Sequence, residues 1–418
     1  MAVQNIAIIG ASAAGVAAAL ALRKADFRGT ITLYDRDPNL PYERPPLSKA
    51  LADRPGLLKP IAAAEVYSDL EIDLCLGAGV RSLSTERVIT LDDGQQSRHD
   101  QVLLTTGVSA RRLDVPGRDL ANVVHLRNSA DASRLSSRLE AGGPLVIVGG
   151  GFIGLELAAV ARSLGLDVTV VELAPLPLQG VVGPAVARLF TSLHLDAGVK
   201  FVTESSVSAF LGSEEVEGVE LIDGRRLPAA TVVVGGRGWS PPTRTSPEES
   251  GWNAPPEESV WTHSGEPPYW LWAAGDVTVR DQRFVRRRGR IEHWDSSQRH
   301  GDAVGRSLGG IPTEETAVPY VWSDQYNLTY QGFGRIEPSD RVVFRRSDVA
   351  SFLVFFLDET SRVRAVTGIG HPPREVRAGK TLIEKGSIVD PAALADPPCT
   401  DIKRLAKGTS PSMASPVR

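Results

Sequence analysis

The stretch Leu145–Glu172, LVIVGGGFIGLELAAVARSLGLDVTVVE, decides the fold. An apolar run, Leu145–Val148, leads into the glycine-rich turn Gly149–Gly154, and a helical pattern follows through Leu155–Leu164. A second apolar run, Val168–Val171, is followed at once by the acid that closes the stretch. A strand, turn, helix and strand with an acid about 20 residues after the last glycine is typical of a dinucleotide-binding unit.

The N-terminal segment repeats this pattern. A strand is expected at Asn5–Ile9, a turn at Gly10–Gly15 (GASAAG), a helix at Val16–Lys24 and a second strand at Ile31–Tyr34. Asp35 follows that strand, 20 positions after the last glycine, against 18 in the later unit. Two such units are much stronger evidence than one glycine motif. The sequence therefore predicts an α/β fold with two Rossmann-like dinucleotide-binding domains.

The later unit is expected to bind NADH. Its glycines let the backbone approach a pyrophosphate, which the start of the following helix then holds. Glu172 would accept hydrogen bonds from a ribose diol and repel a 2′-phosphate, and Leu173–Leu178 contains no Arg or Lys to receive one. NADH is therefore favoured over NADPH. The predicted contacts are Gly149, Gly151, Phe152, Ile153, Gly154 and Glu172.

In the N-terminal unit, Ser12 stands at the middle glycine position. Its hydroxyl could donate to a phosphate oxygen, although its Cβ narrows the approach. Asp35 and Asp37 compete for the ribose. The predicted contacts of this unit are Gly10, Ser12, Ala14, Gly15 and Asp35.

Composition excludes several classes of protein. At 418 residues, two or three domains are expected. The net charge of −4 gives no overall attraction for nucleic acid or an anionic membrane. The two cysteines, Cys75 and Cys399, are too few and too far apart for a disulfide scaffold, a zinc cluster or a dithiol redox centre, and no metal site is expected. The segment Met1–Asn5 carries no basic signal-peptide region, so a cytoplasmic location is expected.

Further strands are expected around these units. Val102–Thr106 and Thr231–Val234 read as strands, and Trp270–Ala274 as a buried strand that reaches Gly275 and Asp276. The stretch Gly238–Pro268 reads as crossing loops. Beyond Ile311 an antiparallel sheet and a helix are expected, at Tyr320–Trp322, Thr329–Phe333, Arg341–Arg345, Phe352–Leu357 and, for the helix, Arg374–Lys385.

Several longer motifs are more specific than any glycine turn. They are PYERPPLSK at Pro41–Lys49, WAAGDV at Trp272–Val277, EHWDSSQRHG at Glu292–Gly301 and VPYVWSDQYNLTYQGFG at Val318–Gly334. Through these stretches the chain resembles the FAD-dependent ferredoxin reductases of oxygenase systems, the group of the putidaredoxin and rubredoxin reductases. The resemblance implies an FAD domain in two segments, 1–111 and 240–317. It also implies an NAD domain at 112–239, a C-terminal α/β domain at 318–407 and a flexible tail at 408–418.

The resemblance also implies roles for single residues. Lys49 is expected at the reactive edge of the flavin, Arg44 in the same loop, and Asp276, after Gly275, on the ribitol chain. Glu156 is expected to meet the nicotinamide end and to pair with Lys49. The remaining implied cofactor contacts are Glu292, His293, Trp294 and Trp322, of which Trp322 joins Lys49 and Glu156 as a catalytic candidate. His293 and His194 are given no catalytic role.

The implied reaction passes electrons from NADH through FAD to a small iron–sulfur ferredoxin. An arginine-rich stretch within Arg280–Arg290, above all Arg283–Arg290, would attract such an acidic partner, or is simply a solvated loop. A monomer or weak dimer is expected. Two departures from the family pattern, Arg36 and the segment Gly235–Thr243, keep other readings open. These are a flavoenzyme acting on a small organic molecule, quinone or oxygen, and a non-catalytic NADH-sensing flavoprotein.

Overall fold

The computed structural model describes residues 3–49, 51, 58–235, 269–282, 285–346, 352–370, 373–395 and 402–406. Contacts divide the chain into two compact units. The second unit comprises Pro175–Leu193, Asp281–Arg287 and the described residues from Val318 onward, and the first comprises the rest. Every helix within the described ranges is too short or too polar to cross a bilayer. The predicted crossing loops at Gly238–Pro268 and the tail at 408–418 lie outside these ranges.

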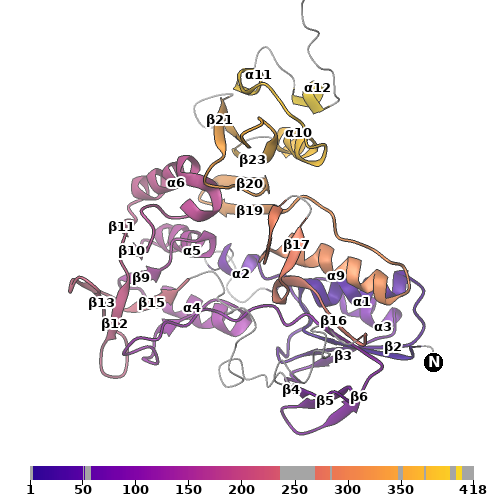
Figure 1. Ribbon diagram of the computed structural model, residues 1–418. Helices are drawn as coiled ribbons and strands as arrows, with labels where there is room; N and C mark the ends of the chain where they lie inside the picture. The colour runs from indigo at the N-terminus through magenta and orange to yellow at the C-terminus, as the bar shows by residue number, and fades with distance from the viewer. Residues whose placement is uncertain are drawn as a thin grey trace, which may run out of the picture. The chain divides into compact units, whose positions relative to one another are not determined.

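The first unit contains a parallel sheet built on the N-terminal repeat (Figure 1). Its strand order is β16-β7-β1-β2-β3. The strands are β1 (Asn5–Ile9), β2 (Thr30–Asp35), β3 (Ile72–Leu76), β7 (Gln101–Leu104) and β16 (Leu271–Ala273). The strand predicted at Trp270–Ala274 is present as β16 but is only partly buried. Trp270 and Ala274 are buried, whereas Leu271 and Trp272 are half-buried and Ala273, in the edge strand of this sheet as described, is exposed.

Two helices pack against each other beside this sheet. They are α1 (Ala13–Lys24) and α9 (Trp294–Leu308). The backbone of α9 approaches α1 closely, since a Cβ on Gly301 would lie 2.1 Å from the carbonyl oxygen of Ala14 and one on Gly305 2.4 Å from that of Ala18. Small residues therefore fix the distance between a helix from the start of the chain and one from its second half.

A second parallel sheet in the same unit is built on Leu145–Glu172. Its order is β11-β10-β9-β15-β8. The strands are β8 (Val123–Val124), β9 (Leu145–Val148), β10 (Val168–Val171), β11 (Lys200–Val202) and β15 (Thr231–Val234), with the helices α4 (Ser129–Ala141) and α5 (Phe152–Ser163). The strands are nearly continuous apolar runs, as parallel strands buried on both faces require.

Each parallel sheet is accompanied by a three-stranded antiparallel sheet that the sequence analysis did not predict. The first is β4 (Val80–Leu83), β5 (Val88–Leu91) and β6 (Gln96–Arg98), and the second is β12 (Val207–Leu211), β13 (Gly218–Leu221) and β14 (Arg226–Pro228). The short elements before Ala317 are α2 (Pro46–Lys49), α3 (Ala64–Asp69), η1 (Gly275–Val277), β17 (Arg280–Gln282) and β18 (Val285–Gly289).

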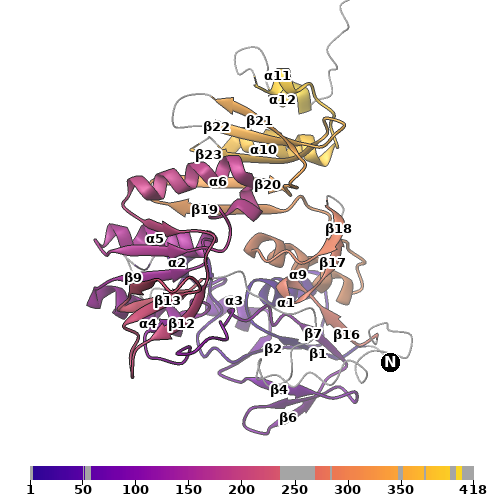
Figure 2. The same ribbon diagram turned by 60° about the vertical axis from the view of Figure 1, so that its left-hand side comes forward.

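The second unit contains a five-stranded antiparallel sheet of order β19-β20-β23-β22-β21 (Figure 2). Its strands are β19 (Tyr320–Gln325), β20 (Leu328–Gly334), β21 (Arg341–Arg346), β22 (Phe352–Leu357) and β23 (Val363–Ile369). Its helices are α10 (Pro373–Glu384), α11 (Pro391–Ala395) and α12 (Ile402–Ala406), joined by α6 (Gln179–Asp196) up to Leu193. Phe190 of α6 packs edge-on against Tyr330 of β20, with ring centroids 5.7 Å apart. The predicted fold class, two Rossmann-like regions and a C-terminal antiparallel sheet, is confirmed, whereas the domain boundaries stay a prediction.

Candidate functional site

The two glycine-rich loops have the same local geometry. Each begins with a glycine at positive φ, Gly10 at 109° and Gly149 at 108°, after a central strand. The next amide donates to the acid at the end of the neighbouring strand, and both distances are 2.6 Å: Ala11 N to Asp35 Oδ2 and Gly150 N to Glu172 Oε2. Each acid is thus fixed beside its loop, and its predicted contact with a ribose stays a prediction.

The last glycine of each loop is required by packing. A Cβ on Gly15 would lie 1.9 Å from the carbonyl oxygen of Gly10, and one on Gly154 2.2 Å from that of Gly149. Gly151 differs, because a Cβ there would meet nothing within 4 Å. The protein does not need that space for its own packing, so the open position beside the start of α5 fits a phosphate group held by the unpaired first-turn amides.

Ser12 begins α1 as its N-cap residue, and its side chain makes no capping hydrogen bond. Its hydroxyl is therefore not needed for the cap, which fits the predicted contact with a phosphate oxygen. Asp35 and Asp37 have different hydrogen-bond partners. Asp35 accepts from the amide of Ala11 in the loop, whereas Asp37 accepts a 2.7 Å hydrogen bond from the hydroxyl of Tyr42. The geometry favours Asp35 for the ribose.

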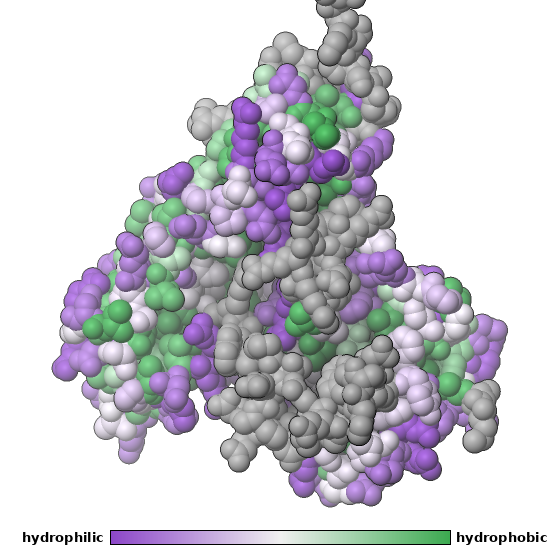
Figure 3. Space-filling view, in the orientation of Figure 1, coloured by the Kyte–Doolittle hydropathy of each residue, from purple (hydrophilic) through white to green (hydrophobic). Residues whose placement is uncertain are grey.

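The flanks of the second loop are apolar. Ile153, in the first turn of α5, is 46% exposed, and Leu173, directly after Glu172, is 72% exposed. Hydrophobic residues are interspersed with hydrophilic ones over the visible face in Figure 3, so these two are notable for their position rather than for their exposure. Apolar side chains beside a phosphate-binding loop suit the flat rings of a dinucleotide. Phe152, directly before Ile153, is the first residue of α5.

Lys49 and Glu156 form an ion pair. The Nζ of Lys49, at the end of α2, donates to Oε1 of Glu156 on α5 over 2.6 Å, and the Glu156 side chain is only 6% exposed. Oε2 of the same carboxylate accepts from the hydroxyl of Ser48 at 2.5 Å. The pair that the resemblance implied is therefore present, and Ser48, which the sequence analysis did not identify, completes it.

Asp276 lies in η1, close to the first loop. Its Oδ1 accepts a 2.6 Å hydrogen bond from the hydroxyl of Ser297 on α9, and the amide of Gly275 donates to Nδ1 of His300 over 3.1 Å. A Cβ on Gly275 would lie 2.9 Å from the Cβ of Ala14. The predicted residues Ala14, Gly275 and Asp276 are thus adjacent in space, although they are far apart in the sequence.

A half-buried arginine accompanies these groups. Burial lowers the pKa of Arg127 to about 10, the cation of Arg44 acts in the same direction, and the carboxylates of Asp276 and Glu292 oppose both. Arg44 also donates to the backbone carbonyl of Arg127 at 3.4 Å. A half-buried guanidinium binds anions more strongly than one fully surrounded by water, so this cluster fits a pyrophosphate. Sequence reasoning missed Arg127 because a single arginine in a loop carries no local signal.

The predicted contacts around the start of α9 have mixed environments. Glu292 is exposed, His293 is the N-cap residue, and Trp294 is the first residue of the helix. Burial lowers the pKa of His293 to about 4, with the Asp295 carboxylate opposing and the Lys49 cation reinforcing that shift. His293 is therefore neutral at ordinary pH. Trp322 belongs to the second unit, where its ring stacks on Tyr320 at 5.6 Å, and its contact with a cofactor stays a prediction.

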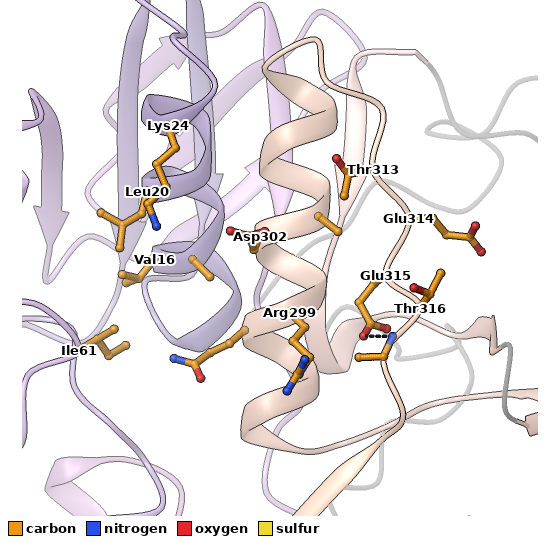
Figure 4. A pocket seen from close by; sticks show the side chains of 14 residues that line it. Val16, Leu20, Lys24, Ile61, Arg299, Asp302, Thr313, Glu314, Glu315 and Thr316 are labelled. Atoms are coloured by element: carbon orange, nitrogen blue, oxygen red, sulfur yellow. Dashed lines mark hydrogen bonds between the residues drawn. The ribbon is translucent and has the colours of Figure 1, made fainter. Parts of the chain in front are cut away.

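Two other features lie apart from these loops. A shallow groove of about 530 Å³ runs between α1, α9 and residues 313–317 (Figure 4), and none of the predicted cofactor residues lines it. In the predicted docking stretch, Arg283 and the side chains of Arg280 and Arg286–Arg288 lie outside the described residues.

Comparison with known proteins identifies the family. The model of the pyridine nucleotide-disulphide oxidoreductase family matches residues 4–301, and that of the reductase C-terminal family matches residues 320–406. The chain is 33% identical over 399 residues to the ferredoxin reductase component of a chlorobenzene dioxygenase from a Cupriavidus species, covering 94% of this chain and 95% of that one.

Solved structures agree with these matches. The ferredoxin reductase for the CYP199A2 system from Rhodopseudomonas palustris has 28% identity and a TM-score of 0.86, covering 96% of this chain and 100% of that one. Putidaredoxin reductase in its covalent complex with putidaredoxin has 29% identity and a TM-score of 0.84, covering 97% and 99%. With two Rossmann-like loops and a C-terminal antiparallel sheet in place, the chain belongs to the ferredoxin reductases of the pyridine nucleotide-disulphide oxidoreductase family, which use FAD and NAD(H).

Proposed function

We propose that this protein takes electrons from NADH and passes them through FAD to a small iron–sulfur ferredoxin that feeds an oxygenase. The observation that supports this most directly is the Lys49–Glu156 ion pair. It joins the short helix α2, next to the predicted flavin loop, to α5, which begins at the predicted NADH loop. The two nucleotide sites are therefore connected at the residues proposed to lie nearest the reacting groups.

Bound FAD would supply the chemistry, because it accepts a hydride from NADH and releases electrons singly to a one-electron acceptor. The chain would supply orientation and charge. Glu172 would receive the adenosine ribose of NADH, and the open position at Gly151 its pyrophosphate. On the flavin side, Asp35 and Asp276 would bind hydroxyl groups, while Arg127 would hold the pyrophosphate. The cation of Lys49 would favour electron density on the reduced ring.

The exit route for the electrons follows from the cysteines. The sequence has only Cys75 and Cys399, and the predicted flavin loop Pro41–Lys49 contains neither. A redox disulfide beside the flavin is thus excluded, so electrons must pass directly to an external acceptor. The relatives named as ferredoxin reductases, and the complex with putidaredoxin, support a ferredoxin as that acceptor. We also propose a cytoplasmic location and a monomer or weak dimer.

The arginine-rich stretch Arg283–Arg290 is proposed to attract the acidic ferredoxin. Replacing Arg286, Arg287 and Arg288 together with alanine should slow ferredoxin reduction, with a weaker dependence on salt, and leave NADH oxidation by ferricyanide unchanged. The matched control replaces the exposed arginines Arg81, Arg225 and Arg226, which should have no such effect. Equal loss of both activities in the first variant would contradict docking at this stretch.

The function is tested by stopped-flow reduction of the FAD-loaded protein with NADH and with NADPH, followed by mixing with an oxidised ferredoxin. Fast NADH-selective bleaching and reoxidation by the ferredoxin are expected. Bleaching without reoxidation by any of several ferredoxins would point instead to a small-molecule acceptor. Very slow bleaching with a persistent charge-transfer band would point to an NADH-sensing role.

A further inference from the structure

Neighbouring residues of α2 hold the two oxygens of one buried carboxylate. The hydroxyl of Ser48 donates to Oε2 of Glu156 at 2.5 Å, and the ammonium of Lys49 donates to Oε1 at 2.6 Å. Ser48 is 5% exposed and Glu156 equally so. The carboxylate is therefore oriented by one neutral donor and one charged donor.

Packing fixes the position of the neutral donor independently of Lys49. Leu47, directly before Ser48, is buried in the same apolar cluster as Leu157, directly after Glu156. The amide of Leu47 donates to the carbonyl of Arg44 at 2.9 Å, and Pro45 and Pro46 restrict the backbone in between. The short helix α2 is thereby anchored against α5, and the hydroxyl of Ser48 is anchored with it.

The two donors have different effects on charge. Lys49 neutralises the carboxylate, and its long side chain can change rotamer. Ser48 orients the carboxylate without cancelling its charge. Because Ser48 holds Oε2 and Lys49 holds Oε1, the position of Oε2 does not depend on the rotamer of Lys49, and its negative charge stays in one place. The nicotinamide ring becomes a cation when it gives up its hydride, and such a charge would stabilise it.

We propose that Ser48 is a positioning residue, which holds Glu156 as a fixed negative charge facing the nicotinamide ring and so strengthens binding of NAD⁺. This inference rests on the proposed function, because it takes Glu156 to lie at the nicotinamide end of the NADH site. It assigns to Ser48 an effect on the ring alone. The adenosine and phosphate groups would contact Glu172 and the loop at Gly149–Gly154, whereas the hydroxyl of Ser48 donates to Glu156.

The experiment compares NAD⁺ with ADP-ribose, which lacks the nicotinamide ring, by calorimetric titration of the FAD-loaded full chain. For Ser48→Ala, the Kd for NAD⁺ should rise about tenfold, because the less ordered carboxylate must be fixed when the ring binds, while the Kd for ADP-ribose stays within about twofold. Ser48→Thr, which keeps the hydroxyl, should restore most of the NAD⁺ affinity. Unchanged NAD⁺ binding, or an equal loss for both ligands, would overturn the proposal.

A matched control is Ser136→Ala. Ser136 is also buried and also donates to a glutamate, Glu140, at 3.5 Å, but within α4. That variant should bind both ligands as the wild type does. FAD content and Tm of each variant report on folding, and Ser48→Cys, which fills the same space with a weaker donor, should give an intermediate Kd.

Steady-state kinetics with ferricyanide give a second measurement. In Ser48→Ala, inhibition by NAD⁺ should weaken about tenfold, whereas KM for NADH, whose ring is neutral, should change much less. If wild-type protein is not reduced by NADH at all, the proposed function fails. If the wild type is reduced normally and Ser48→Ala shows unchanged inhibition by NAD⁺, only the role of Ser48 fails.

Discussion

Glu172 accepts a 2.6 Å hydrogen bond from the amide of Gly150, and this bond joins the end of β10 to the loop that follows β9. Its other oxygen, Oε1, accepts from the amide of Ala174 at 2.8 Å. The carboxylate is therefore fixed beside the loop before any nucleotide arrives. Since each carboxylate oxygen can accept more than one hydrogen bond, it can still receive a ribose diol.

Glu172→Gln should reduce the preference for NADH over NADPH. The amide keeps the size of the side chain and one acceptor, but it removes the charge that repels a 2′-phosphate. The kcat/KM for NADH should fall about tenfold while that for NADPH rises, since each 1.4 kcal/mol is a factor of ten. Steady-state rates with ferricyanide at low salt measure both constants.

An unchanged ratio between the two nucleotides in Glu172→Gln would mean that the adenosine ribose lies elsewhere. Asp167→Asn is a suitable control, because Asp167 is an exposed acid before β10 that pairs with Lys200 at 2.8 Å. It changes the net charge equally and should leave the ratio as it is.

Gly151→Ala and Gly154→Ala should fail in different ways. At Gly151 the backbone φ is −77°, which alanine adopts freely, and the new Cβ would meet no atom of the described residues within 4 Å. We expect an unchanged Tm and a Kd for NADH raised at least about tenfold, because the methyl group occupies the phosphate position. At Gly154 the Cβ would lie 2.2 Å from a carbonyl oxygen, so the fold should lose about 1–3 kcal/mol of stability.

Thermal melting measures the loss of stability in both glycine variants, and NADH titration measures the loss of binding. A Gly151→Ala protein that binds NADH normally would show that the open position is not the phosphate site. A Gly154→Ala protein with wild-type Tm would contradict the close contact between α5 and the loop.

Ser297→Ala should weaken FAD binding. The hydroxyl of Ser297 donates to Oδ1 of Asp276 at 2.6 Å, and this bond fixes the carboxylate proposed to bind the ribitol chain. Without this bond the carboxylate must be ordered when FAD binds, so the Kd for FAD should rise about tenfold. Fluorescence titration of the apoprotein with FAD measures it.

The control for Ser297 lies on the same helix. Ser307 donates to the neutral carbonyl of Thr313 at 3.2 Å, away from Asp276. Ser307→Ala should retain FAD as the wild type does, and equal weakening in both variants would indicate a general effect on α9 instead.

Local patterns predicted the strands well and the helix starts less well. β1, β9, β10 and β15 have the expected bounds. The helices α1 and α5 start three residues earlier than expected, at Ala13 and Phe152. The reason is that Gly15 and Gly154 lie inside the first turn, where their missing side chains allow the helix to contact the loop. In a sequence such glycines read as part of the preceding turn.

The two three-stranded antiparallel sheets carry a local sequence pattern for hairpin turns. The turns Asp92–Gly94 and Ile222–Gly224 contain Asp-Gly pairs between apolar stretches, which is the pattern of a tight hairpin. Ser48, Arg127 and Ser297 had none. Their partners are distant in sequence, and serines and arginines are mostly exposed. Only the folded chain therefore reveals that Ser48 and Ser297 are buried and that all three lie beside charged groups.

His293 should make stability depend on pH. Burial lowers its pKa to about 4, against an ordinary value near 6.5, so the unfolded chain binds a proton that the folded chain excludes. Above pH 6.5 His293 is neutral in both states and does not lower the free energy of unfolding. As the pH falls from 6.5 toward 4, protonation of the unfolded chain lowers that free energy. At pH 5 the loss is about 2 kcal/mol.

His293→Asn removes this titration while keeping a polar side chain of similar size. Urea unfolding followed by tryptophan fluorescence at pH 8 and pH 5 should show a decline smaller by about 2 kcal/mol in the variant than in the wild type. Some decline should remain, because burial lowers the pKa of His99 and His125 in the same direction. An equal decline in both proteins would mean that His293 is protonated freely in the folded state, and that the start of α9 is open to water.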